Sequence, residues 1–201
     1  MHKNQQTIDK IWQTISEKNL CSASFDDAIT KTYFFHKIGQ IFDIPLVYYD
    51  FDLLYSGYLG ANILSQNKNV ELLNPKENWR NTVGETIDKI SKQKHIVVID
   101  SLNGFFTLLT DNKDSGRIIN TVLIMMASAA TKSDSTVLIG STAKSKNNDG
   151  WFLPGIGRKV VQIPKMNFIS VRKQNGALNL ISWNDDNSVK FSLPITNLDF
   201  E

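Results

Sequence analysis

The chain has 201 residues, 41% of them hydrophobic, which is enough for one domain with a substantial core. Its 22 basic and 20 acidic residues give a formal net charge of +2, so charge alone does not indicate binding to nucleic acid or membrane. Cys21 is the only cysteine, which excludes a disulfide within the chain and fits a reducing compartment. No segment approaches the ~20 apolar residues that cross a bilayer, and the polar N-terminal residues contain no apolar stretch of the kind that a secretory signal needs. We therefore expect a cytoplasmic protein without a membrane partner.

The first elements alternate between helix and strand. Residues 7–18 carry apolar side chains at the i, i+3, i+4, i+7 spacing of an amphipathic helix, with Thr7 as its candidate N-cap. Residues 20–25 form a short strand candidate, and a helix that ends at Phe42 follows it. Residues 46–49 are a continuous apolar run, which is typical of a strand buried on both faces.

The middle of the chain continues this alternation. Residues 95–100 are the strongest strand candidate, because four consecutive β-branched apolar residues precede Asp100. The other elements predicted here are a loop and helix over 50–64, a strand over 70–73, helices over 78–93 and 117–132, and a strand over 136–140. Strands that alternate with helices indicate right-handed βαβ units and a parallel sheet.

The pattern changes after Gly155. Four short strands are predicted over 158–163, 168–172, 177–183 and 188–193, with hairpin-type turns at 174–176 and 184–187. The sequence therefore predicts an α/β protein with a mostly parallel central sheet and a C-terminal antiparallel extension. We expect a single domain over residues 1–201, made of an N-terminal helix (1–18), an α/β core (19–150) and a C-terminal β-meander (151–201). Residues 151–154 are a hydrophobic cluster. If exposed, it would suit a partner or single-stranded nucleic acid by stacking; if buried, it would cap the sheet.

Residues 25–32 have the form of a phosphate-binding loop that lacks its glycines. A loop of the form GxxxxGK[ST] joins a buried strand to a helix, and its glycines let backbone N–H groups surround phosphate oxygens. Lys31 and Thr32 occupy the positions of the phosphate-binding lysine and the Mg²⁺-binding hydroxyl, whereas Phe25 and Thr30 stand at the glycine positions. Side chains with a Cβ resist the conformations that such a loop needs. The pattern predicts an impaired nucleotide site, and an ordinary helix start with a solvent-facing lysine is the alternative.

The strand, this loop, the helix, the apolar strand that ends at Asp100 and the C-terminal meander together resemble the RecA/KaiC-like branch of the P-loop ATPases. The resemblance covers about residues 18–195 and implies a RecA-like three-layer α/β fold. Asp100-Ser101-Leu102 resembles the end of the family's Walker B strand, whose carboxylate holds the Mg²⁺ shell. The resemblance makes Lys31, Thr32 and Asp100 a vestigial nucleotide site, with Thr32 and Asp100 as metal ligands only if Mg²⁺–nucleotide binds. An Asp100 that merely caps the following residues is the alternative.

Two further positions follow from the resemblance. Asp50 and Asp52 lie where the family places the acid that orients the attacking water; Asp52 matches better by spacing and is the candidate catalytic residue, although it is shorter than glutamate. Arg172 and Lys173 lie where KaiC-like proteins carry a basic pair that reaches a neighbouring subunit's nucleotide site. Surface loop acids and an ordinary charged hairpin end are the alternatives.

The function we expect is that of a non-hydrolysing pseudo-ATPase. It would act as an assembly or regulatory subunit in a homo-oligomer, or in a hetero-oligomer with RecA-like relatives, similar in kind to the ring subunits of Elongator, and would need no cofactor. The alternative is a weak recombinase- or KaiC-like ATPase that binds ATP and Mg²⁺ and acts on nucleic acid. A third possibility is a regulatory protein that binds single-stranded DNA or RNA.

Overall fold

The structure, a computed structural model, describes residues 2–142, 144–145, 151–153, 158–159, 166–174 and 177–195. The turn residues 175–176 of the first predicted hairpin and most of the predicted strand over 158–163 lie outside the described residues. So do the side chains of residues 151–153, whose exposure the sequence left open.

A central eight-stranded sheet has the strand order β11-β10-β9-β1-β5-β4-β2-β3. Its strands are β1 (Leu20–Phe25), β2 (Leu46–Asp50), β3 (Val70–Leu73), β4 (Ile96–Asp100), β5 (Thr136–Thr142), β9 (Asn167–Gln174), β10 (Ala177–Trp183) and β11 (Val189–Pro194). The six strands from β9 to β3 in this order run parallel to one another. Strand β10 pairs antiparallel with β9 on one side and with β11 on the other. The α/β class with a C-terminal antiparallel extension is confirmed.

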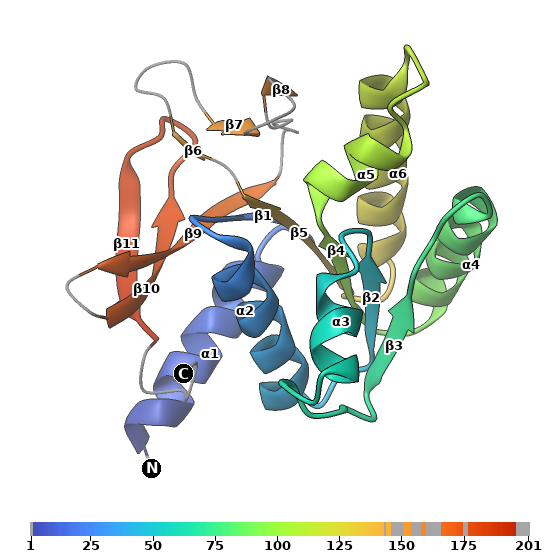
Figure 1. Cartoon of the computed structure of the whole chain (residues 1–201). Coiled ribbons are helices and arrows are strands. Elements are labelled where there is room, and N and C mark those ends of the chain that lie inside the picture. Colours follow the sequence, from blue (N-terminus) through green and yellow to red (C-terminus); the bar gives the residue numbers. More distant parts are fainter. Residues whose placement is uncertain are drawn as a thin grey trace.

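Helices cover both faces of this sheet and complete three layers (Figure 1). One face packs against α1 (His2–Ser16), α2 (Ala28–Ile41) and α3 (Leu54–Gly60). The other packs against α4 (Trp79–Lys92), α5 (Leu102–Leu108) and α6 (Ser115–Ala130). No helix in the described part of the chain is both long and apolar enough to cross a membrane.

The central strands are apolar throughout because each face of the sheet has its own hydrophobic core. In β4, Val97 and Ile99 pack into the core beneath α4–α6, and Ile96 and Val98 pack into the core beneath α1–α3. Successive side chains of a strand point to opposite faces, so a strand covered on both sides has no place for a polar alternation. Cys21 of β1 is fully buried, and burial raises the pKa of its thiol, as expected of a structural cysteine.

The structure corrects the predicted start of the first helix. Helix α1 begins at His2 rather than after Thr7, so it also includes residues 2–7. Gln5 Nε2 donates a hydrogen bond to Asp9 Oδ1 at 2.9 Å, an i,i+4 contact that supports this extension.

Two other features were not predicted. Helix α5 follows β4 directly, and its N-cap Ser101 accepts a hydrogen bond from the Gly104 N–H. Strand β9 also belongs to the parallel part of the sheet, because it pairs parallel with β1 as well as antiparallel with β10.

The short strands β6 (Lys144–Ser145), β7 (Trp151–Leu153) and β8 (Arg158–Lys159) form a separate three-stranded sheet.

Candidate functional site

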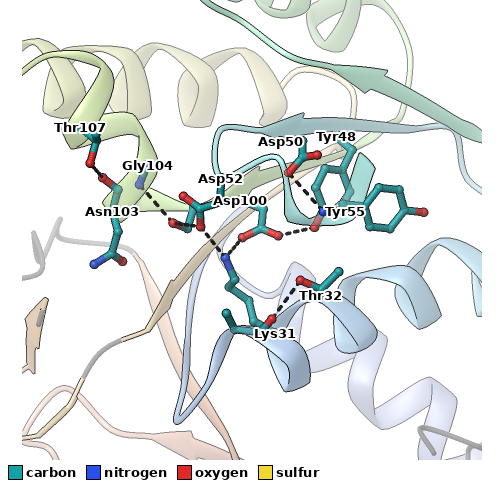
Figure 2. A network of polar contacts seen from close by, with 12 residues as sticks. Lys31, Thr32, Tyr48, Asp50, Asp52, Tyr55, Asp100, Asn103, Gly104 and Thr107 are labelled. Carbon is teal, nitrogen blue, oxygen red and sulfur yellow. Dashed lines mark hydrogen bonds and ion pairs between the residues drawn. The ribbon is translucent and has the colours of Figure 1, made fainter. Parts of the chain in front are cut away.

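The candidate residues gather where three parallel strands end at the same edge of the sheet. Lys31 lies on α2 just after β1, Asp52 follows β2, and Asp100 is the last residue of β4 (Figure 2). In α/β folds the carboxyl ends of the strands are where ligands bind. The structure therefore brings together three residues that lie far apart in the sequence.

Lys31 is fully buried and lies between two carboxylates. Its Nζ atom forms an ion pair with Asp100 Oδ1 and lies 2.9 Å from Asp52 Oδ2. The hydroxyl of Tyr48 donates to the other oxygen of Asp100, and Ser101 Oγ donates to Asp52 Oδ2 at 2.6 Å. The sequence-based alternative of a solvent-facing lysine is therefore wrong, and Tyr48 and Ser101 are partners that the sequence did not identify.

The network favours the charged form of Lys31. Burial disfavours the ammonium, but the carboxylates of Asp100 and Asp52 outweigh it and raise the pKa of Lys31. Burial also raises the pKa of Asp100, against the effect of Lys31 and Tyr48. Lys31 and Asp100 therefore form an ion pair. Two hydrogen-bond donors, Lys31 and Tyr48, converge on the Asp100 carboxylate, and a neutral Asp100 would leave the buried ammonium with Asp52 as its single counter-charge. Burial and the adjacent Asp100 raise the pKa of Tyr48, which keeps its hydroxyl a donor.

The connection between β1 and α2 is a two-residue turn. Strand β1 ends at Phe25 and α2 begins at Ala28, so the connection consists of Asp26 and Asp27. Asp27 is the N-cap of α2, and its carboxylate accepts hydrogen bonds from the backbone N–H of Thr30 at 2.7 Å and from the Thr30 hydroxyl at 2.8 Å. The two residues at the expected glycine positions thus lie in regular structure, Phe25 in the strand and Thr30 in the helix.

The side chain of Thr32 hydrogen-bonds to the backbone of its own helix. Its hydroxyl donates to the carbonyl oxygen of Ala28 at 2.9 Å, and the residue is fully buried. Such i−4 bonding is common for threonine within helices. The described part of the chain contains no group of three or more His, Cys, Asp or Glu side chains placed to hold a metal ion.

The two acids after β2 have different surroundings. Asp50 is buried, and its carboxylate accepts hydrogen bonds from the backbone N–H groups of Tyr55 and Ser56 at the start of α3. Asp52 has a 30% exposed side chain and contacts Lys31. Asp50 therefore stabilises the start of a helix, where a negative charge is favourable, and Asp52 belongs to the lysine network.

The basic pair on β9 is separate from this network. Arg172 Nη1 lies 2.6 Å from Asp26 Oδ1, in the turn before α2, and Nη2 donates to Ser24 Oγ at 3.4 Å. Lys173, the next residue along the strand, is exposed. In this single chain Arg172 therefore contacts the β1–α2 turn, and Lys173 is the member of the pair that is open to solvent.

Gly104 provides the space that Asp52 occupies. A Cβ atom at this position of α5 would overlap Asp52 Oδ1 and would lie 2.7 Å from Phe51 Cβ. The Gly104 N–H donates to Ser101 Oγ, and that hydroxyl in turn donates to Asp52. A glycine inside a helix normally costs stability, so the close approach of β2 and α5 explains its presence here.

Comparison with solved structures assigns the fold. The chain resembles the crystal structure of a RadB recombinase, with a TM-score of 0.58 and 11% identity over 88% of this chain and 86% of that one. It also resembles a KaiC-like protein from the hyperthermophilic archaeon Pyrococcus horikoshii, with a TM-score of 0.50 and 12% identity over 87% and 83% of the two chains. No family model matches the sequence, and no curated protein matches it either. The protein thus has the RecA/KaiC-like fold, as the resemblance in the sequence predicted.

We predict that Lys31→Met destabilises the protein by about 3–5 kcal/mol, because it leaves Asp100 as a buried charge without a counter-ion. Urea unfolding followed by circular dichroism measures this loss. The double variant Lys31→Met/Asp100→Asn should recover part of it, since the unpaired charge is then also removed. The control is Lys89→Met, which breaks the half-exposed pair with Glu71 and should cost about 0–1 kcal/mol. Equal effects of the two single variants would contradict a structural role for the buried pair.

We predict that Gly104→Ala destabilises the protein by about 1–3 kcal/mol, because the added methyl group displaces Asp52 or Phe51. The matched control is Gly84→Ala in α4, where a Cβ atom would meet no atom within 4 Å. That control should stabilise by about 0.5–1 kcal/mol, as alanine does in a helix. Thermal or urea unfolding of both variants measures the difference. A stabilising Gly104→Ala would contradict the close approach.

Proposed function

We propose that this chain is a RecA/KaiC-like subunit that does not hydrolyse ATP and acts as an assembly or regulatory subunit of a homo- or hetero-oligomer. The observation that carries the proposal is the position of Lys31. Its ammonium is buried and already neutralised by Asp100 and Asp52 of the same chain. A phosphate-binding lysine has to offer its charge to the ligand instead.

The energetics of nucleotide entry support this proposal. A triphosphate would have to draw Lys31 away from a buried carboxylate, and a buried charge left alone costs about 3–5 kcal/mol. It would also have to replace Asp27, whose carboxylate already accepts the hydrogen bonds of Thr30 at the start of α2. Each charge-assisted hydrogen bond that the turn fails to offer would forfeit about 1.5–3 kcal/mol of affinity.

The residues do not fit a Mg²⁺–nucleotide complex in their present arrangement. Thr32 and Asp100 would be its ligands, but the Thr32 hydroxyl bonds to Ala28 and Asp100 is held by Lys31 and Tyr48. We therefore expect no Mg²⁺–nucleotide complex at the carboxyl edge and no hydrolysis there. The second candidate, a weak ATPase, is favoured by the convergence of Lys31, Asp52 and Asp100 at the edge where α/β proteins bind ligands.

Titration with Mg²⁺–ATP in a calorimeter separates the two functions. We expect no Mg²⁺-dependent binding up to about 1 mM and no Mg²⁺-dependent shift in melting temperature, whereas a ligand at 100 times its Kd stabilises a protein by about 2.7 kcal/mol. Micromolar, Mg²⁺-dependent binding would contradict the proposal. If binding were found, Thr32→Val would show whether the hydroxyl takes part, because this variant keeps the shape of the side chain and the buried ion pair.

The surface beside the network supports an assembly role. Ile29 in the first turn of α2 is 56% exposed, and Leu53, directly before α3, is 51% exposed. Both lie next to a strand end at the carboxyl edge, as does the exposed Lys173. Large apolar side chains around a common edge, with a cation beside them, are features of a protein–protein contact surface.

Sedimentation velocity tests the assembly. We expect species heavier than the 22.7 kDa monomer, and we expect Ile29→Glu to dissociate them because a charge at a packed contact is left without a partner. The matched control is Ile124→Glu on the outer face of α6, where the side chain is 52% exposed. A protein that stays monomeric at all concentrations would contradict self-assembly, and equal effects of both variants would contradict the choice of surface.

A further inference from the structure

A cavity lies on the α1–α3 side of the sheet, and the three residues of the Lys31 network are not part of its lining. It has a volume of about 580 Å³ and is formed by α2 together with the end of α3 and residues 61–66, which follow that helix. Helices α2 and α3 lie side by side on this face (Figure 1). The volume is within the range of small-molecule sites. Lys31, Asp52 and Asp100 do not line this cavity.

The lining has a distinct chemistry. It contains one cationic side chain, Lys37, and no carboxylate. Lys37 has no ion-pair partner among the residues that the structure describes. The polar groups around it are mostly neutral amides and hydroxyls, from Tyr33, Gln40, Asn62, Ser65 and Gln66. A cationic ligand would find no counter-charge here, whereas an anion would find Lys37.

The floor of the cavity is fixed by a buried histidine. His36 is 4% exposed, its Nδ1 lies 3.0 Å from the Tyr55 hydroxyl, and its Nε2 lies 2.9 Å from Gln40 Nε2. Burial, and to a lesser extent Lys37, lower the pKa of His36, so this ring is neutral at pH 7. Gln40 also donates to Ser65 Oγ at 3.4 Å, which joins α2 to the opposite wall. The cavity therefore has a hydrogen-bonded polar floor and a single positive charge.

We propose that this cavity binds a small organic anion whose neutral part is rich in hydrogen-bonding groups, of which phosphate monoesters of sugars and nucleosides are examples. Lys37 neutralises the anionic group. The side chains of Asn62, Ser65 and Gln66 bond to the neutral part, and Leu59 and Ile63 supply apolar contact. This site goes beyond the assembly function proposed above and does not depend on it.

Histidine NMR signals provide a direct test on the intact chain. The protein has three histidines, His2, His36 and His95, so the imidazole signals of His36 are readily assigned with a His36→Gln variant. We expect AMP, glucose 6-phosphate or both to shift the His36 signals saturably, with a Kd below about 1 mM, and to leave those of His2 and His95 in place. Inorganic phosphate should act at least about tenfold more weakly, because it lacks the neutral part.

Substitutions locate the binding. Lys37→Met keeps the aliphatic stem and should weaken binding at least about tenfold, the size of one charge-assisted contact. Lys113→Met, at an exposed lysine after α5, is the control and should change nothing. Thr32→Val should also leave the affinity unchanged; a loss there would place the ligand at the carboxyl edge and overturn the proposal. It is equally overturned if neither ester shifts His36 at about 10 mM, or if inorganic phosphate binds as tightly as the esters.

Discussion

The buried ammonium of Lys31 is the constraint on which the arrangement of this edge depends. A lone charge in the protein interior is too costly to persist, so it has to be matched by opposite charge and hydrogen bonds. Asp100 and Asp52 supply the charge. Tyr48 donates to the second oxygen of Asp100, and Ser101 donates to the same oxygen of Asp52 that Lys31 contacts. Gly104 and Gly140 leave room for the side chains of this network, because neither has a Cβ atom. A Cβ atom on Gly140 of β5 would lie 2.5 Å from Phe35 and 3.3 Å from the Lys31 stem, and one on Gly104 would overlap Asp52.

The charges in the short turn before α2 are also matched by neighbouring groups of the chain. The helix begins at Ala28, so Lys31 lies within its first turn rather than at the end of an open loop. Asp27 supplies the negative charge that a helix start favours, and Arg172 balances the neighbouring Asp26. The side chains of this edge are thereby paired with one another. Asp27 lies at the start of α2, where P-loop proteins of this fold bind phosphate, and Lys31 lies between two acidic residues.

Much of this architecture could be predicted from the sequence, because it depends on local patterns. The apolar strand that ends at Asp100 and the position of Lys31 after β1 both follow from residues close together in the chain. Tyr48 could not be identified as a partner of Asp100, because this requires the parallel register of β2 and β4, which pairs Tyr48 with Val98 and Asp50 with Asp100. Ser101 was missed for a related reason: its role depends on α5, a helix of seven residues with little periodicity of its own. The pairing of Arg172 with Asp26 likewise depends on β9 lying beside β1, which no local pattern determines.

The carboxyl-edge network and the α2 cavity are in physical contact through aromatic side chains. His36 hydrogen-bonds to Tyr55, Tyr55 stacks on Tyr48 with ring centroids 4.2 Å apart, and Tyr48 donates to Asp100. This chain of contacts does not by itself couple the two places. Coupling would require an element with two arrangements, whose relative stability changes at both places. Helix α2 belongs to both places, because it carries Lys31 near its start and both His36 and Lys37 one turn or more later. A small shift or rotation of α2 would change the cavity wall and the lysine network together. Helix α2 is thus held near its start by the Lys31 ion pair and lines the cavity along its side.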